Sequence, residues 1–152
     1  MTTLRLFDAH NHLQDDRFGG GQEALLGACR RTGVESMVVN GSGGEDWAAV
    51  ASLARAHPGL VIPSFGVHPW YVHEQAADWQ TRLRNALDEL PLAVGEIGLD
   101  RWKPGLPYEG QEEAFVFQLR LAAERQRPVS IHCLRAWGRL AELLRAHPRP
   151  DC

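Results

Sequence analysis

The sequence predicts an α/β fold, namely a parallel (β/α) barrel of the TIM type that is incomplete, with about five of eight strand–helix units present. Short apolar runs alternate with helical stretches without a hairpin signal, which indicates parallel strands joined by right-handed crossovers. Four of these runs end in histidine, aspartate or glutamate, as expected where a barrel places its chemistry at the carboxyl ends of its strands. They are Asp8-Ala9-His10-Asn11-His12, Gly66-Val67-His68-Pro69, Gly95-Glu96-Ile97-Gly98-Leu99-Asp100 and Ile131-His132-Cys133.

The first strand is expected over Leu4–Leu13, where the apolar residues begin. A helix over Gln22–Thr32 follows, because its apolar residues recur on one helical face and Gly33 provides a C-cap. The next apolar run, Val34–Asn40, contains Val38-Val39 and predicts the second strand.

The middle of the chain repeats this pattern, with proline ending each helix. An alanine- and leucine-rich helix is expected over Glu45–His57 and stops at Pro58-Gly59. The third strand is expected over Leu60–Val67, and the following helix over Trp79–Leu90 ends before Pro91.

The last two units follow the same logic. A fourth strand over Leu92–Leu99 leads through a proline- and glycine-rich loop, Lys103–Tyr108, into a long helix from about Glu109 to Gln126. A fifth strand over Val129–Cys133 precedes a helix over Arg135–Ala146. The runs are continuously apolar, so we expect strands covered on both faces.

The organisation admits one alternative architecture. A doubly wound sheet has the same alternation and could be complete with five units, but no glycine-rich phosphate fingerprint follows the first strand. No linker is visible, so residues 1–152 are expected to form a single domain.

Composition excludes several classes of protein. The chain has 152 residues, 44% of them hydrophobic, and a net charge of −3, which argues against binding nucleic acid through a broad basic surface. No apolar run approaches the ~18 residues that span a bilayer, so no membrane partner is expected. The 3 cysteines are odd in number and scattered, which argues against a disulfide framework and favours a cytoplasmic location.

His10 and His12 lie two residues apart on a strand, so both side chains point to the same side. At the mouth of a barrel, two convergent imidazoles make half of a metal site. Asp8 shares their parity and is expected to orient one of the imidazoles. The alternative is a pair of exposed histidines at the end of a strand.

Glu96 lies within an otherwise apolar strand, where a carboxylate needs a cation or a hydrogen-bond donor. A glutamate at the centre of a histidine cluster can bridge two divalent ions. Asp100 has the same parity and ends the strand, where it serves catalysis or else braces the loop.

His132 is the third candidate imidazole ligand, whereas His68 is expected to contact substrate or handle a proton. Cys133 has the opposite parity to His132 and is expected to be a buried core thiol. Three further histidines, at helix ends or in loops, are expected on the surface: His57, His73 and His147. Four aromatic residues lie in loops and are expected either to stack on a ring substrate or to fill a loop core. They are Trp70, Tyr71, Trp102 and Tyr108. Arg101 and Arg135 are candidates for anion contacts.

These motifs resemble those of the TatD-related metal-dependent deoxyribonucleases, a family of the amidohydrolase-like barrel superfamily. The resemblance covers essentially the whole chain, which would be the N-terminal part of such a barrel. The resemblance includes residues of the helix that follows the strand containing Glu96. The residues that carry it are Phe7-Asp8-Ala9-His10-Asn11-His12-Leu13, Gly66-Val67-His68-Pro69, Ala93-Val94-Gly95-Glu96-Ile97-Gly98-Leu99-Asp100, Pro128-Val129-Ser130-Ile131-His132, Gln111, Phe115, Gln118, Leu119, Leu121 and Ala122.

The resemblance implies that His10, His12, Glu96 and His132 are metal ligands, with Glu96 bridging two divalent ions. It places His68 beside the substrate phosphate. The expected catalytic residues are Glu96, His68 and Asp100. A metal-activated water would then cleave a phosphodiester bond in DNA or a nucleotide. Histidine-rich ligation suits zinc or manganese better than magnesium.

The pattern of the family also includes a histidine on strand six and an aspartate on strand eight, which would lie beyond Cys152. Two alternatives therefore stand beside the deoxyribonuclease. One is a truncated, catalytically incomplete protein that binds metal weakly, or that assembles with itself through open barrel edges. The other is an amide or lactone hydrolase of the same superfamily, which a carboxylated lysine on strand four would support, but Glu96 occupies that strand.

Overall fold

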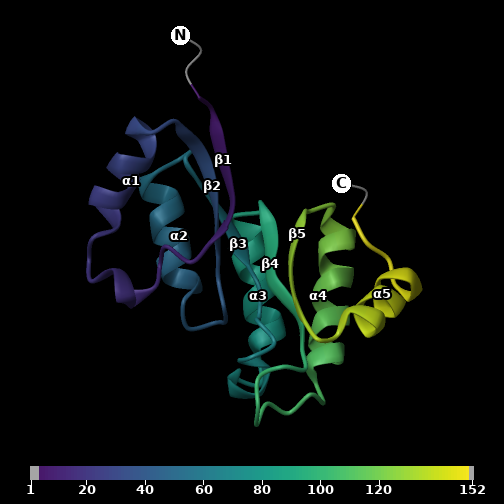
Figure 1. Cartoon of the computed structure of the whole chain (residues 1–152). Helices are drawn as coiled ribbons and strands as arrows, with labels where there is room; N and C mark the ends of the chain where they lie inside the picture. The colour runs from purple at the N-terminus through teal and green to yellow at the C-terminus, as the bar shows by residue number, and fades with distance from the viewer. Residues whose placement is uncertain (1–3, 151–152) are drawn as a thin grey trace.

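The computed structural model describes residues 4–150, and its single sheet has five parallel strands in the order β1-β2-β3-β4-β5. The strands are β1 (Leu6–Asn11), β2 (Val34–Asn40), β3 (Val61–Phe65), β4 (Ala93–Asp100) and β5 (Val129–Leu134). The helices that follow them are α1 (Gln22–Arg31), α2 (Trp47–Ala56), α3 (Trp79–Glu89), α4 (Gln111–Arg125) and α5 (Trp137–Ala146). The helices lie outside the curved sheet (Figure 1), which confirms the predicted incomplete barrel.

Short 3-10 helices and turns modify the predicted boundaries. The loops after β1 and β3 contain η1 (Asp16–Phe18) and η2 (Val72–Glu74), which the sequence pattern did not predict. Strand β1 stops at Asn11 because its side-chain oxygen accepts the N–H of Leu13, which turns the chain away from the sheet. His12 therefore lies just beyond the strand instead of within it.

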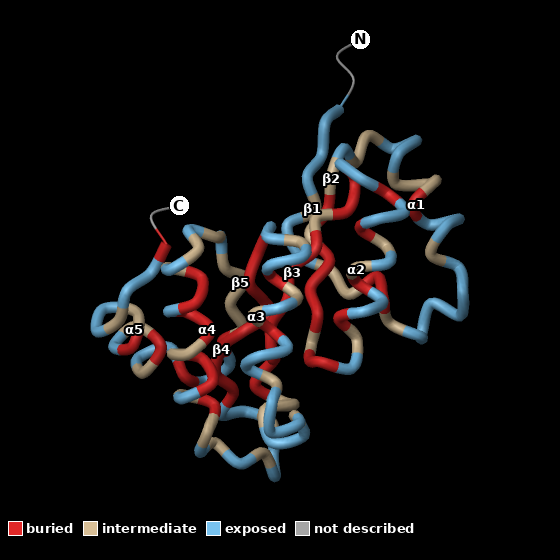
Figure 2. Tube along the Cα trace, turned by 180° about the vertical axis from the view of Figure 1, so that it is seen from behind, coloured by how far each residue is buried: buried red, intermediate tan, exposed pale blue. Residues whose placement is uncertain are grey.

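Burial along the strands increases toward the middle of the sheet. Every residue of β4 is buried, whereas Leu6 and Phe7 of β1 are 42% and 58% exposed. Figure 2 shows the same contrast, with buried residues concentrated in the central strands. The prediction that the strands are covered on both faces is thus correct for β4. It is wrong for β1, because β1 is an edge strand of this sheet.

The core lies between the sheet and the helices that cover it. Its largest fully buried side chains include Phe65, Phe115, Ile97 and Leu119. Cys133 is 8% exposed and packs in this core, as its parity on the strand predicted. Cys152 lies outside the described residues. Among residues 4–150, no helix has the length and apolar character needed to cross a membrane.

Two buried glutamines of α4 hold the carboxyl ends of the central strands. The side-chain oxygen of Gln118 accepts the N–H of Val67 at 2.7 Å, and its nitrogen donates to the carbonyl of the same residue at 3.2 Å. The side-chain oxygen of Gln111 accepts the N–H of Asp100 at 2.8 Å. Both glutamines are fully buried, so α4 fixes the backbone beside His68 and at Asp100.

Gly98 allows β4 and β5 to approach closely beside the predicted site. A Cβ atom at this position would lie 1.9 Å from the carbonyl oxygen of His132, which no side chain tolerates. The register of these strands, in which Gly98 lies opposite His132, therefore depends on glycine at position 98.

Candidate metal centre

Glu96 lies at the centre of four imidazoles, and each of its two carboxylate oxygens faces a different pair. Its Oε2 atom lies 3.2 Å from Nε2 of His10 and 3.2 Å from Nε2 of His12. Its Oε1 atom lies 3.2 Å from Nδ1 of His132 and 3.8 Å from Nε2 of His68. Two groups of three potential metal ligands thus share one carboxylate.

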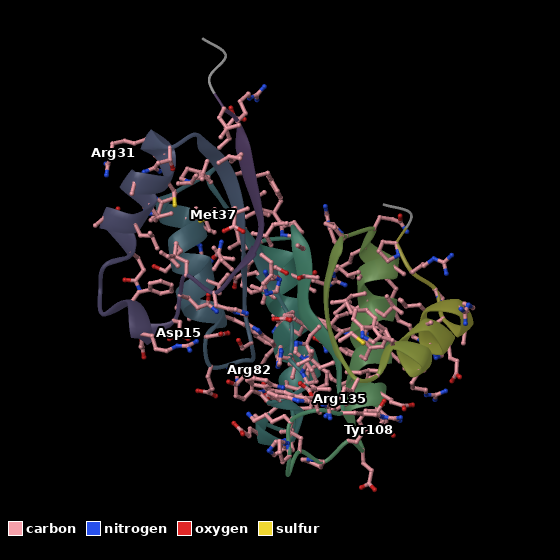
Figure 3. The ribbon with its side chains drawn as sticks, viewed as in Figure 1. Asp15, Arg31, Met37, Arg82, Tyr108 and Arg135 are labelled. Atoms are coloured by element: carbon pink, nitrogen blue, oxygen red, sulfur yellow. The ribbon has the colours of Figure 1, made fainter. Side chains whose placement is uncertain are left out.

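The site lies where the strands end. Asp15, Tyr108 and Arg135 follow β1, β4 and β5, and Figure 3 shows all three in the lower half of the molecule. The carboxyl ends of the parallel strands therefore bring residues far apart in the sequence to one edge of the sheet, as in barrel enzymes.

Hydrogen bonds determine which ring nitrogen of two histidines is available to a metal. Nδ1 of His12 lies 2.8 Å from the backbone carbonyl of Asn40, to which only an N–H can donate. Nε2 of His132 lies 2.9 Å from Oδ2 of Asp100, which likewise accepts. The opposite nitrogens, Nε2 of His12 and Nδ1 of His132, both face Glu96, and a neutral ring offers its lone pair there.

His68 has the reverse arrangement. The backbone N–H of Trp70 donates to Nδ1 of His68 at 3.2 Å, so the neutral ring carries its proton on Nε2. The ring therefore presents an N–H donor toward Glu96, where a metal ligand would present a lone pair. The side chain is only 8% exposed.

The charges in the site are coupled. Burial alone would raise the pKa of Glu96, but hydrogen bonds from His12 and His132 outweigh burial and hold that pKa well below its usual range. The hydrogen bond with Glu96 raises the pKa of His12. Burial would lower the pKa of His132, but its bonds to Glu96 and Asp100 raise it. Glu96 is therefore ionised at neutral pH.

His68 responds in the opposite direction. Burial disfavours its imidazolium form and lowers its pKa from 6.5 to about 4, despite the nearby Glu96 charge. Its ring is therefore neutral at pH 7, whereas His12 and His132 gain protons more readily.

Asp100 uses both of its oxygens to brace the site. Oδ2 accepts from Nε1 of Trp70 at 2.6 Å and faces His132, while Oδ1 accepts the backbone N–H groups of Trp102 and Lys103. Burial would raise the pKa of Asp100, yet these hydrogen bonds lower it to about 2. Of the two roles that the sequence left open, its contacts match the bracing of a loop and of an imidazole.

Two site residues were missed by sequence reasoning. The side-chain nitrogen of Asn40 lies 3.2 Å, and the hydroxyl of Ser130 2.8 Å, from Nδ1 of His10. Both are ordinary polar residues in β2 and β5, and only the placement of Ser130 two residues before His132 hints that it faces the same side. Asp8, expected to orient an imidazole, instead accepts the backbone N–H of His10 and the side-chain N–H of Asn11.

The three other histidines differ from one another. His73 is exposed and His147 half-buried, but His57 is 7% exposed, so its expected surface position is wrong. Its ring can be buried because Nε2 lies 2.7 Å from Glu23 and Nδ1 lies 3.2 Å from Arg30. These partners satisfy both ring nitrogens.

The loop aromatics and arginines differ in their contacts. Lys103 lies 3.9 Å above the ring of Trp70, and Arg101 lies 4.1 Å above the ring of Tyr108. Trp102 is 52% exposed. Arg135 is also exposed and follows β5 directly, so it remains a candidate for an anion contact.

A cavity of about 590 Å³ adjoins the imidazole cluster on the side of His12. Its walls come from the loops after β1, β2 and β3, and they carry five carboxylate side chains. These are Asp15, Asp16, Glu45, Asp46 and Glu74.

The residues present fit a divalent-metal site. Imidazole nitrogens and a carboxylate are common ligands of zinc and manganese. One oxygen of Glu96 faces His10 and His12 and the other faces His132, so two groups of potential ligands share this carboxylate.

Comparisons with known proteins identify the family that the chain resembles. A family model described as TatD related DNase matches residues 7–152. The 3'-5' ssDNA/RNA exonuclease TatD of Pantoea sp. (strain At-9b) is 34% identical over 140 residues, which are 91% of this chain and 54% of the relative. The uncharacterized metal-dependent hydrolase YjjV of Escherichia coli (strain K12) is 32% identical over 149 residues, or 96% of this chain and 57% of the relative.

Solved structures show the same fold. The crystal structure of YjjV, a TatD homolog from Escherichia coli, superposes with a TM-score of 0.87 at 32% identity, over 94% of this chain and 56% of that one. A TatD family hydrolase from Entamoeba histolytica superposes with a TM-score of 0.85 at 19% identity, over 96% of this chain and 55% of that one. The chain spans about half the length of the curated relatives it matches.

Proposed function

The chain belongs to the family of TatD-related DNases, and from this premise we propose that it carries the metal centre of a hydrolase that cleaves phosphodiester bonds in nucleic acid. The observation that supports this most directly is the position of Glu96. Its carboxylate is 9% exposed, and its two oxygens divide the surrounding imidazoles into two groups. A buried carboxylate with this distribution of donors is suited to bridge two cations.

We propose His10, His12, Glu96 and His132 as the ligands of two divalent ions. Zinc or manganese suits this donor set better than magnesium. When bound, such ions stabilise negative charge on phosphate oxygens and lower the pKa of a coordinated water. Asp100 positions His132, because its Oδ2 atom holds the ring with Nδ1 toward Glu96.

His68 has a separate role in this proposal. Because Trp70 donates to Nδ1, the neutral ring presents an Nε2–H group beside Glu96. A neutral N–H donor can hold a phosphate oxygen of the substrate without competing with the ligands for a cation. This assignment keeps His68 as a substrate contact and not as a ligand.

The adjoining cavity is expected to exclude substrate phosphates. Its five carboxylates repel anions, so the phosphodiester would lie over the imidazoles and only an uncharged part of the substrate would enter the cavity. The name of the Pantoea relative includes both single-stranded DNA and RNA, and we propose a single-stranded polynucleotide as the substrate class.

The test is a zinc and manganese titration of the purified chain by calorimetry, with cleavage of an end-labelled single-stranded oligonucleotide measured alongside. Glu96→Gln is expected to abolish binding of at least one ion and any chelator-sensitive cleavage, because the neutral amide cannot bridge two cations. His10→Ala is expected to weaken the binding of the ion on the Oε2 side of Glu96. Glu89→Gln, at an exposed glutamate of α3 paired with Arg55, is the matched control.

The two readouts separate the alternatives. Metal binding that is unchanged in Glu96→Gln contradicts the proposed centre. Tight metal binding without cleavage by the chain supports the centre and favours the catalytically incomplete protein. Cleavage of an amide or a lactone, with no cleavage of the oligonucleotide, contradicts the proposed phosphodiesterase activity.

A further inference from the structure

We infer that Asn40 is a positioning residue of the metal centre, whose side-chain oxygen accepts a hydrogen bond from Nδ1–H of His10 when a divalent metal is bound. The inference rests on the proposed function, because it takes Nε2 of His10 as a metal ligand. Asn40 ends β2, and its side chain is fully buried beneath the two histidines of β1 and the turn that follows.

Asn40 contacts both histidines through different groups. Its backbone carbonyl accepts from Nδ1 of His12 at 2.8 Å and from the side chain of Gln14 at 2.8 Å. Its side-chain Nδ2 lies 3.2 Å from Nδ1 of His10. One residue therefore lies against the ring nitrogens that face away from Glu96 in both histidines.

The side-chain contact is incompatible with metal binding as it stands. For Nε2 of His10 to offer a lone pair, the neutral ring must carry its proton on Nδ1. An Nδ1–H group and the NH₂ group of Asn40 would then be two donors facing each other at 3.2 Å. The amide arrangement in this structure instead suits a ring that is protonated on Nε2, toward Glu96.

A second observation shows how the amide can adapt. Oδ1 of Asn40 is buried and has no hydrogen-bond partner among the described residues, although a buried amide oxygen ordinarily has one. A half-turn of the amide exchanges its oxygen and nitrogen. This turn brings the unpartnered oxygen to Nδ1–H of His10, and the NH₂ group gives up its 3.2 Å contact with Nδ1 of His10 and its 3.5 Å contact with the carbonyl of Val38.

Ser130 does not distinguish between the two neutral tautomers of His10. Its hydroxyl lies 2.8 Å from the same nitrogen of His10, and a hydroxyl donates or accepts as the ring requires. Ser130 therefore accommodates both tautomers, whereas the orientation of the Asn40 amide selects one of them. The amide orientation and the metal-binding tautomer of His10 are thus linked.

The experiment compares zinc affinity in Asn40→Leu, Asn40→Asp and Ser64→Ala. Leucine has a similar size but no acceptor, so zinc affinity is expected to fall about 10- to 100-fold, the usual effect of removing a hydrogen-bond partner behind a metal ligand. Aspartate can only accept, so Asn40→Asp is expected to bind zinc at least as tightly as the original chain. Ser64 pairs with Asn40 across the sheet and is equally buried, and its alanine variant is the control expected to retain full affinity.

Nitrogen-15 NMR of the unmodified chain supplies a readout that a purely structural role would not change. Saturation with zinc is expected to give His10 protonated on Nδ1 and to shift the side-chain NH₂ signals of Asn40, and this result does not depend on any variant being folded. Unchanged zinc affinity in folded Asn40→Leu, a loss in Asn40→Asp equal to that in Asn40→Leu, or unmoved Asn40 signals on zinc binding would each overturn the role of Asn40. An unmodified chain that binds no zinc would instead overturn the proposed centre itself.

Discussion

Glu96 and His68 are buried neighbours, yet burial affects their ionisation in opposite ways. Glu96 keeps its charge because His12 and His132 donate to it, and its pKa is depressed although burial alone would raise it. His68 accepts a hydrogen bond from the backbone N–H of Trp70 at 3.2 Å, and its Nε2 atom lies 3.8 Å from Glu96, so burial dominates and lowers its pKa to about 4. The balance between burial and local hydrogen bonds thus decides which of the two side chains is charged.

The lowered pKa of His68 predicts acid destabilisation of the metal-free protein. A group whose pKa is depressed on folding contributes stability above its unfolded value of 6.5, and this stability is lost as the pH falls toward about 4. Between pH 7 and pH 4 the free energy of unfolding is expected to fall by about 2–3 kcal/mol from this residue alone. Urea denaturation at several pH values in the presence of a chelator measures the change.

His68→Asn isolates this contribution. Asparagine does not titrate, so its stability is expected to vary much less between pH 6.5 and pH 4.5. His12 and His132 have raised pKa values, so protonation stabilises the folded state at these positions as the pH falls and opposes the slope from His68. Both histidines are present in the original chain and in the variant, so the comparison isolates His68. An equally steep decline in the variant would assign the acid sensitivity to other groups.

Asp100→Asn tests the bracing role. The amide NH₂ group would face donors whichever way it turned, because each oxygen of Asp100 now accepts from two groups. We expect a loss of about 1–3 kcal/mol in the free energy of unfolding, together with weaker zinc binding as His132 loses its anchor. Asp88→Asn, at an exposed aspartate of α3, is the control for thermal denaturation and zinc titration.

The sequence predicts the titratable residues of the site but not the polar, non-titratable residues that contact them. His10, Glu96 and His132 stand out because titratable residues at the ends of apolar strands need a reason to be there. Asn40 and Ser130 give no such signal, since asparagine and serine are common at strand ends. Their contacts with His10 cross 30 and 120 residues of sequence, which only the fold brings together.

At the scale of elements, α4 controls the geometry of two strands. Gln118 occupies both backbone groups of Val67, just beyond the end of β3 and next to His68. Gln111 binds the backbone of Asp100, the last residue of β4. A helix outside the barrel thereby sets the position of two side chains inside it.

Gln118→Leu is expected to lower the free energy of unfolding by about 2–4 kcal/mol. Leucine fills most of the space but leaves the N–H and carbonyl of Val67 buried without partners. Gln80→Leu, on the exposed face of α3, is the control expected to change stability by less than about 0.5 kcal/mol. Urea denaturation compares the two variants, and equal stabilities would contradict the role assigned to Gln118.

Element order could be predicted from periodicity, but element ends could not. The interval of β2 was predicted at Val34–Asn40 as observed, because its apolar run is bounded on both sides. Helices α2, α4 and α5 each begin two residues later than expected. In the loop before α2, the carboxylate of Asp46 accepts the backbone N–H groups of Ser42 and Gly43, and hydrophobic periodicity contains no information about such contacts.

For the whole molecule, a metal that binds only the folded state must stabilise it. Zinc at about 100 times its dissociation constant adds about 2.7 kcal/mol, which for a domain of this size corresponds to a rise of roughly 5–10 °C in Tm. The rise should disappear with a chelator and be small in His10→Ala. Differential scanning calorimetry measures it, and a Tm that is insensitive to zinc would contradict binding to the folded site.

The hydrogen bond between His10 and Ser130 joins the first and last strands of the sheet, across 120 residues of sequence. Such a contact closes nearly the longest loop that the described chain can make, and it forms only after the strands between have taken their places. Zinc capture should consequently lag behind the appearance of secondary structure in a refolding experiment. Zinc binding would then report a late step in the assembly of this sheet, because its ligands meet only after β1 and β5 are both in place.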